Sequence, residues 1–238
     1  MRYLIVSDLH ANLEALEAVV REAEGQYDRV LCCGDLVGYG ADPNAVVEWV
    51  RANCTVVVRG NHDRACTGQE DLEWFNPVAR AAAVWTQQAL SAENAQYTAD
   101  LPQGPILIDG LQVVHGSPFD EDEYVLAADE AGQAFGYLES RLAFFGHTHV
   151  PMAFIRDDGV ERQRIDKLRI DSSKKYFINV GSVGQPRDGD WHAAYCIYHI
   201  DSAVVEQRRL KYDLKTAQKK IIDAGLPRLL AERLALGR

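Results

Sequence analysis

The sequence predicts an α/β fold, arranged as one layered domain that spans all 238 residues. Two observations carry this prediction. The first 65 residues alternate short apolar runs with amphipathic segments, which is the pattern of a β-α-β-α-β unit. Apolar strand patterns then return as far as residue 209, so both halves of the chain supply strands. No repeat and no linker-like stretch separates them, and the length fits one large domain.

The first strand-to-helix unit sets the pattern for the rest of the chain. Residues 3–7 are mostly apolar, as in a strand covered on both faces. Residues 12–23 then place Leu and Val at helical spacing between Glu residues. A second strand at 29–33 precedes a helix that begins at Pro43, with Asp42 as its cap. Turns that follow such strands lie at the edge where open α/β sheets bind ligands.

The middle of the chain combines a helical region with a hairpin. A strand at 55–58 leads toward the Ala-rich region 72–100, which we expect to form two helices broken near Ser91. The segment 66–100 is accordingly a candidate helical cap. Residues 105–115 place an Asp-Gly turn between two apolar runs, which indicates a β-hairpin.

The C-terminal half returns to strands and ends in helices. A helix at 130–141 is expected to lead into a strand at 142–145, and a second Asp-Gly turn at 158–159 indicates an exposed hairpin. Three more strands are expected at 176–180, 193–200 and 203–209. The segment 211–238 is basic and helical in pattern.

Composition narrows the range of partners. The formal net charge of −10 argues against general nucleic-acid binding, because a protein that binds the phosphate backbone needs a basic face. The charge is uneven, since residues 208–238 carry nine Lys or Arg against three Asp or Glu. Five cysteines without paired spacing indicate reduced thiols. No signal pattern and no apolar run of membrane-spanning length is present, which predicts a cytoplasmic protein without a membrane partner.

Polar motifs follow five of the apolar strands. Five of the seven histidines fall in these turns, and glycine flanks four of the five motifs. Histidines scattered through a core would not gather in this way. In chain order the motif residues are Asp8 and His10, then Asp35, then Asn61, His62 and Asp63, then His115, and finally His147 and His149. Together they predict a metal site.

The residue types indicate which metals fit. Carboxylate, imidazole and amide oxygen ligands without cysteine favour Mn, Fe, Zn or Co over copper or iron–sulfur chemistry. Seven ligands exceed the needs of one ion and suit two ions that share a carboxylate, an arrangement that supports phosphate ester hydrolysis. We therefore expect two divalent ions as cofactors, with Mn as the first choice.

The order Asp-x-His, Gly-Asp, Gly-Asn-His-Asp, His and Gly-His-x-His resembles the signature of the calcineurin-like metallophosphoesterases. Within that superfamily, segments 39–44, 115–118 and 179–187 resemble a small bacterial branch of phosphodiesterase and diadenosine-tetraphosphatase-like proteins. The resemblance extends to about residue 210. It implies a four-layer αββα sandwich with a dimetal site at the C-terminal ends of the strands.

The resemblance also implies a role for each motif residue. One ion would be bound by Asp8, His10, Asp35 and His149, and the other by Asp35, Asn61, His115 and His147. A hydroxide that bridges the ions would attack phosphorus in line. His62 would not be a ligand but would stabilise or protonate the leaving oxygen, and we expect Asp63 to orient its ring.

One departure from the best-known relatives concerns the residues after the Gly-Asp block. Serine/threonine protein phosphatases carry Asp-Arg there, which supplies a phosphate contact and a carboxylate for the catalytic histidine. This chain has Gly38 and Tyr39 instead, which weakens a protein-phosphatase assignment and leaves the partner of His62 open. Arg187, in a Gly/Pro-rich loop, is a candidate phosphate contact, with a solvated loop position as the alternative.

These observations favour an enzyme that hydrolyses phosphodiester or pyrophosphate-type bonds in small phosphoester molecules or nucleotides. A phosphomonoesterase or serine/threonine protein phosphatase is the alternative within the same chemistry. A nuclease is disfavoured by the acidic body of the chain, although the basic C-terminal segment keeps it open. A non-catalytic scaffold is disfavoured because the motif set is intact.

Overall fold

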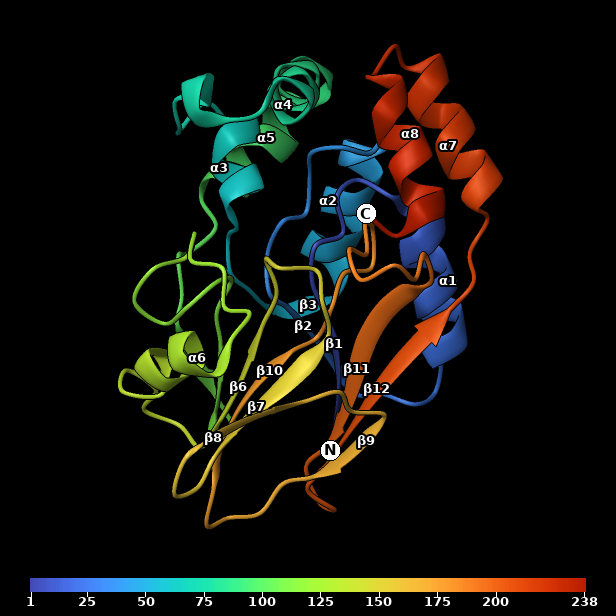
Figure 1. Cartoon of the computed structure of the whole chain (residues 1–238). Helices are drawn as coiled ribbons and strands as arrows, with labels where there is room; N and C mark the ends of the chain where they lie inside the picture. The colour runs from blue at the N-terminus through green and yellow to red at the C-terminus, as the bar shows by residue number, and fades with distance from the viewer.

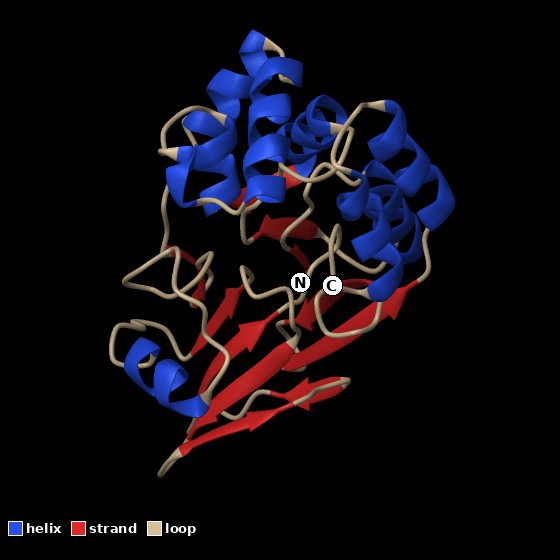
Figure 2. Ribbon diagram, turned by 45° about the horizontal axis from the view of Figure 1, so that its top comes forward, coloured by secondary structure: helices blue, strands red, loops and turns tan.

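Two six-stranded sheets pack face to face in the computed structural model, with helices on both outer sides (Figures 1 and 2). The structure describes residues 1–238 except for the side chain of Trp74. Across the first sheet the strands are β3 (Cys54–Val57), β2 (Arg29–Cys32), β1 (Arg2–Val6), β11 (Ala193–His199), β12 (Val204–Leu210) and β9 (Lys167–Arg169). Across the second sheet they are β4 (Ile106–Ile108), β5 (Leu111–Val113), β6 (Leu142–Phe145), β10 (Lys175–Asn179), β7 (Met152–Arg156) and β8 (Val160–Gln163).

Three apolar cores separate the four layers. The first lies between the first sheet and the helices above it, the second between the two sheets, and the third between the second sheet and α6 (Ala128–Ala134). The helices on the first sheet's side are α1 (Leu13–Ala23), α2 (Pro43–Asn53), α3 (Asn61–Cys66), η1 (Leu72–Trp74), α4 (Pro77–Ala89), α5 (Ala92–Ala99), α7 (Leu214–Asp223) and α8 (Arg228–Leu236). The expected α/β class and αββα layering are confirmed.

Strand β1 shows why its sequence is almost continuously apolar. Leu4 and Val6 face the helices, whereas Tyr3 and Ile5 face the second sheet, and all four side chains are fully buried. A strand between two cores has no polar face, so the usual alternation of apolar and polar residues disappears. The same reason makes the run before Asp35 apolar.

The pairing pattern collects the strand ends at one edge. In the first sheet β1, β2 and β3 run parallel, and in the second sheet β5, β6 and β10 do. Parallel strands end on the same side, so the turns after them meet there. These are the turns that carry the polar motifs.

Most expected elements are present within one or two residues, and two details differ. The expected helix at 130–141 ends at Ala134, because the N–H groups of Gly136 and Tyr137 donate only three residues back and tighten the chain into a turn. Asp42 stands at the start of α2 but its carboxylate makes no capping bond. It pairs with Lys220 of α7 instead, at 2.9 Å.

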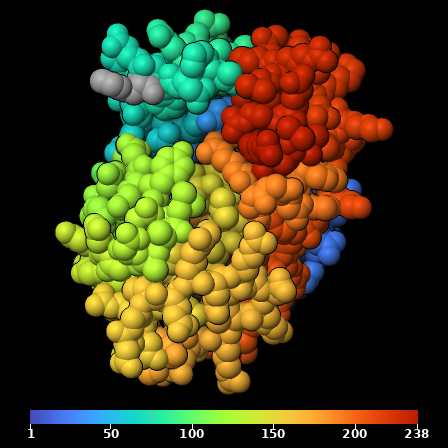
Figure 3. All heavy atoms as spheres, viewed as in Figure 1, coloured from blue at the N-terminus to red at the C-terminus, as the bar shows by residue number. Residues whose placement is uncertain are grey.

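Two groups of helices, within residues 61–99 and 214–236, share one end of the molecule (Figure 1). Helices α3, α4 and α5 lie on one side, and α7 and α8 lie on the other (Figure 1). In the space-filling view the cyan surface stands above the green segment that holds α6, and the red surface stands beside it, above orange segments (Figure 3). Among the described residues, no helix is long and apolar enough to cross a membrane.

Candidate metal centre

The turns at the strand ends hold their side chains through unusual backbone conformations. Left-handed φ angles occur at Asp8 (+52°), His10 (+46°), Asp35 (+54°), His147 (+62°) and His149 (+59°). Each such angle at a residue with a Cβ costs on the order of 1–3 kcal/mol and persists only where the surroundings fix it. Five of the seven expected ligands therefore lie in strained turns, as residues shaped for a site do.

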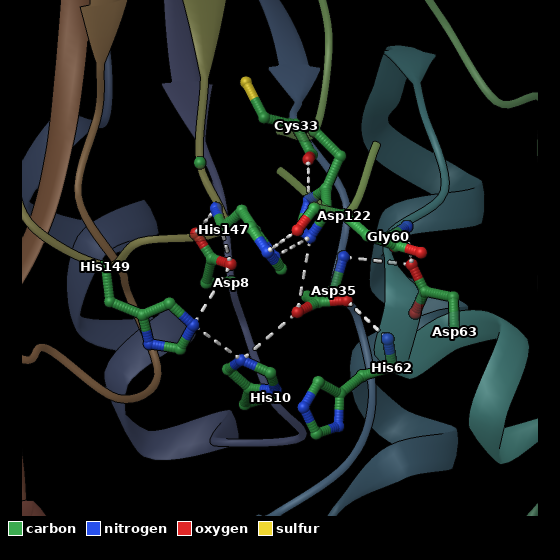
Figure 4. A network of polar contacts seen from close by, with 12 residues as sticks. Asp8, His10, Cys33, Asp35, Gly60, His62, Asp63, Asp122, His147 and His149 are labelled. Atoms are coloured by element: carbon green, nitrogen blue, oxygen red, sulfur yellow. Dashed lines mark hydrogen bonds and ion pairs between the residues drawn. The ribbon is translucent and has the colours of Figure 1, made fainter. Parts of the chain in front are cut away.

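The first cluster contains four of the expected ligands, all buried. Nε2 of His149 lies 3.3 Å from Oδ1 of Asp8, and Nε2 of His10 lies 3.6 Å from Oδ2 of Asp35. The two imidazole nitrogens face each other at 3.2 Å. Figure 4 shows these side chains converging from separate segments of the chain.

The second cluster shares Asp35 with the first. The same Asp35 oxygen, Oδ2, lies 3.5 Å from Nε2 of His115, and that nitrogen lies 3.1 Å from Nδ1 of His147. Oδ1 of Asn61 is buried and has no hydrogen-bond partner among the described residues. One carboxylate oxygen thus faces both clusters, and the amide oxygen of Asn61 still lacks a partner.

Each of the four histidines is fixed by a hydrogen bond on its other ring nitrogen. These bonds run to main-chain carbonyls: His10 Nδ1 to Val37 (3.0 Å), His149 Nδ1 to Gln185 (2.6 Å), His115 Nδ1 to Cys33 (2.7 Å) and His147 Nε2 to Asp122 (2.9 Å). A carbonyl only accepts, so these nitrogens carry the hydrogens. In a neutral ring the remaining nitrogen is then a bare lone pair.

The facing nitrogens of His10 and His149 therefore present two lone pairs to each other at 3.2 Å, with no hydrogen between them. Such an arrangement is repulsive unless a cation lies between or beside the nitrogens, and it is the arrangement that carbonyl-oriented metal ligands adopt. Together with the unpartnered Asn61 oxygen, it fits a group of ligands for metal ions.

Electrostatics supports the same fit. Burial lowers the pKa of His147 to about 3, and it lowers the pKa values of His10 and His149 well below their ordinary value. Burial opposes ionisation of Asp35, but the neighbouring charge of His115 holds the pKa of this carboxyl well below its usual range. Against the effect of burial, the Asp35 carboxylate raises the pKa of His115 to about 10, so an ion that binds this ring would displace a proton from it. Neutral His10, His147 and His149 beside an ionised Asp35 are already in the ligand state that divalent ions require.

Asp63 does not contact the His62 ring, contrary to the expected pairing. Its Oδ2 accepts hydrogen bonds from the main-chain N–H groups of Asp35 and Gly60, both at 2.9 Å, and its Oδ1 accepts from Leu36 at 2.9 Å. Among the described residues, every hydrogen bond to this buried carboxylate comes from a main-chain N–H group. Asp63 thus holds the turn that presents Asp35.

His62 is held by packing and by its own main chain. Its N–H donates to Oδ1 of Asp35 at 2.9 Å, and its ring lies against Tyr39 (4.3 Å between centroids) and Phe75 (5.6 Å). Gly38 makes room for the ring, since a Cβ there would lie 2.7 Å from Nδ1 of His62, and its φ is +84°. The Gly38-Tyr39 pair that replaces Asp-Arg therefore orients His62 without a carboxylate.

Arg187 lies close to the clusters and has no acidic partner among the described residues. Its Nη2 is 3.3 Å from Oε1 of Gln185 and 3.4 Å from the Tyr39 hydroxyl, and its Nε is buried without a partner. Its main-chain N–H donates to the carbonyl of His149 at 3.3 Å. The guanidinium is thus available to an anion beside the metal ligands.

Three further side chains at this edge were absent from the sequence prediction. Phe75 precedes α4, the Tyr124 ring stacks on His147 with centroids 4.1 Å apart, and Arg233 of α8 lies 5.7 Å from the centroid of the Tyr39 ring. Tyr124 is half exposed although aromatic, a signal that sequence alone does not contain. Arg233 sits in an amphipathic helix like any surface arginine.

Comparison of the sequence with known proteins identifies the family to which the chain belongs. Residues 1–203 match the model of the calcineurin-like phosphoesterase superfamily domain. An uncharacterized protein of Methanocaldococcus jannaschii is 40% identical over 245 residues, which cover 98% of this chain and 97% of that protein.

Solved structures agree at the level of the whole chain. A metallophosphoesterase from Sphaerobacter thermophilus, known from a crystal structure, is 43% identical in sequence. The two structures superpose with a TM-score of 0.91, and the match covers 100% of this chain and 99% of that one. A hypothetical protein from Pyrococcus horikoshii shares the fold at 18% identity, with a TM-score of 0.80 and coverage of 100% and 98%.

Proposed function

The chain belongs to the calcineurin-like phosphoesterase superfamily and is a hydrolase of phosphoric esters, and on this premise we propose that it cleaves phosphodiester or pyrophosphate-type bonds of small molecules or nucleotides. The proposal rests on two close pairs of imidazole rings, His10 with His149 and His115 with His147, which lie on the two sides of Asp35. This arrangement suits two ions that share one carboxylate.

The proposed ligand sets follow the two clusters. Asp8, His10, Asp35 and His149 would hold one ion, and Asp35, Asn61, His115 and His147 would hold the other. When bound, the ions would supply Lewis acidity and a lowered pKa for water. Mn is the first choice of metal, with Fe, Zn and Co as alternatives, because the ligands are imidazole, carboxylate and amide oxygen.

The chain's own side chains would position the substrate. His62 faces the clusters with its ring fixed by Tyr39 and Phe75, so it can donate a hydrogen bond to the leaving oxygen. Burial lowers the pKa of His62 to about 4, which favours a neutral ring with one N–H to donate. Arg187, which lacks an acidic partner among the described residues, would bind a phosphoryl oxygen.

The same residues favour a phosphodiesterase or pyrophosphatase activity over a protein-phosphatase activity. The Gly38-Tyr39 pair leaves out the phosphate-binding arginine at that position, and Tyr39 fills the space with a ring. Phe75, at the start of the helical region, touches His62, which supports residues 66–100 as a cap on a single domain of 1–238. Five free cysteines, four of them buried, support a cytoplasmic location.

The test is a substrate panel on metal-stripped protein, reloaded in turn with Mn, Fe, Zn, Co and Mg. We expect Mn-loaded protein to hydrolyse bis-p-nitrophenyl phosphate or a dinucleotide pyrophosphate faster than p-nitrophenyl phosphate. His62→Ala should lower turnover about 10²- to 10⁴-fold while metal content is retained. His199→Ala, at the end of β11 and outside both clusters, is the matched control.

Three results would contradict parts of the proposal. Hydrolysis of none of these substrates with any metal would remove the phosphoesterase assignment for this centre. A rate on p-nitrophenyl phosphate well above that on the diester would favour the phosphomonoesterase alternative. Full turnover in the His62→Ala variant would remove the role of that residue at the leaving oxygen.

A further inference from the structure

Arg233 brings the C-terminal helix to the candidate metal centre. Its guanidinium lies 5.7 Å from the centroid of the Tyr39 ring, and that of Arg187 lies 5.8 Å from the same centroid. The centroid of the Tyr39 ring lies 4.3 Å from that of the His62 ring and 4.7 Å from that of the His10 ring. Both guanidinium groups thus lie beside the ring that packs on His62 and on the proposed metal ligand His10.

The position of Arg233 is fixed by the packing of α8. Leu230 and Leu234, on either side of it in the helix, are buried in the core that α8 shares with α1 and α7. The end of the helix is tied to the loop after Arg187, since the N–H of Gly189 donates to the carbonyl of Gly237 at 3.0 Å. The helix therefore presents Arg233 at a defined place rather than on a mobile tail.

Neither guanidinium pairs with an aspartate or glutamate among the residues that the structure describes. Arg187 contacts the Tyr39 hydroxyl and Gln185, and Arg233 donates through Nε to the main-chain oxygen of Arg238 at 2.9 Å. By contrast, Arg209 on β12 pairs with Asp188, in the same loop. In a chain with ten more acidic than basic residues, two guanidinium groups beside one aromatic ring, neither of them paired with an aspartate or glutamate among the described residues, are a local exception.

The two cations also act on each other. Burial and the charge of Arg187 both lower the pKa of Arg233 from its ordinary value. Both side chains are only partly exposed, so solvent does not fully screen this repulsion. An anion that contacts both groups would remove the repulsion and satisfy donors that now lack acceptors.

We propose that Arg187 and Arg233 form a subsite for a second phosphoryl group, next to the one that reacts at the metal centre. This inference rests on the proposed function and narrows it: the substrate carries a diphosphate or longer phosphate chain. A simple phosphodiester has one negative charge and could satisfy one guanidinium. A diphosphate has more charge and more acceptor oxygens, and it can reach both.

The test compares one-phosphorus and two-phosphorus probes on Mn-loaded, desalted protein. Methylphosphonate and methylenediphosphonate are titrated by calorimetry, because neither is hydrolysed and binding is read without turnover. We expect the wild-type chain to bind the diphosphonate more tightly. Arg233→Gln should weaken diphosphonate binding about 10- to 100-fold, the size expected for hydrogen bonds to charged groups, and leave methylphosphonate binding within about twofold.

Matched variants keep the result interpretable. Arg228→Gln removes another arginine of α8, one that pairs with Glu232 at the surface, and should change neither affinity. Arg187→Gln should also weaken diphosphonate binding, and Arg233→Lys, which keeps the charge, should lose less than Arg233→Gln. Thermal unfolding of each variant checks that α8 remains folded.

The subsite and the proposed function fail separately. Equal affinity for both probes in the wild type, or an unchanged diphosphonate affinity in a folded Arg233→Gln variant, would overturn the subsite even if the enzyme cleaves diesters. An Arg233-dependent preference for the diphosphonate in a protein that hydrolyses no phosphoester would uphold the subsite and overturn the function.

Discussion

Replacement of Asp63 by asparagine separates two roles for this buried carboxylate. The Asp63 carboxylate accepts hydrogen bonds from the main-chain N–H groups of Asp35, Leu36 and Gly60, each at 2.9 Å. An amide has only one accepting oxygen, so the variant loses one or two of these three bonds and turns an N–H₂ group toward the donors. Burial and the charge of Asp35 raise the pKa of Asp63 to about 7, so the comparison is made at pH 8.5, where the carboxyl is ionised. At about 1.5–3 kcal/mol for each hydrogen bond to a charged group, the free energy of unfolding should fall by about 2–5 kcal/mol.

The same change should loosen the turn that presents Asp35, which faces both clusters. We expect metal affinity to fall about 10- to 100-fold, as for other residues that support metal ligands. Urea unfolding of the metal-free chain gives the stability, and calorimetry gives the affinity. Asp213→Asn, which keeps a good cap at the exposed start of α7, is the control and should change stability by less than about 0.5 kcal/mol.

A different outcome would refute this reasoning. If Asp63→Asn kept its stability and its metal content but lost turnover, the carboxylate would act through His62, as the sequence pattern predicts. The hydrogen bonds to the Asp35 turn would then be incidental.

Three further changes test neighbouring parts of the account. Gly38→Ala places a Cβ 2.7 Å from Nδ1 of His62, so turnover should fall at least tenfold with metal content unchanged; normal turnover would show that the ring has room to move. Asp35→Asn removes the shared carboxylate, and elemental analysis should find both ions lost rather than one. Lys220→Met breaks the ion pairs that join α7 to α1 and α2, and urea unfolding should show a loss of about 1 kcal/mol; no loss would mean that α7 is held by its apolar face alone.

The strand ends are predictable from sequence because their cause is local. An apolar run that ends in a polar residue, in four of the five cases beside a glycine, indicates a buried strand and its turn, and parallel pairing then brings such turns to one edge. The residue pattern by itself therefore places Asp8, Asp35 and His115 together at that edge. The clustering of these side chains in the fold agrees with it.

The partners of those residues are less predictable, because they depend on which segments meet in three dimensions. Asp63 follows His62 directly, yet the start of α3 turns its carboxylate toward the Asp35 turn and away from the imidazole. Arg233 lies 194 positions after Tyr39, and no local pattern distinguishes it from a surface arginine. Asp42 has the composition of a helix cap but meets a lysine from α7.

Two ions that share Asp35 are the centre of the proposed site, and crystals of the Mn-loaded protein test their presence directly. An anomalous difference map should show two peaks roughly 3.5–4 Å apart. One peak should lie beside His10 and His149, the other beside His115 and His147, with the Asp35 carboxylate between them. A single peak, or two peaks that do not share Asp35, would contradict the account.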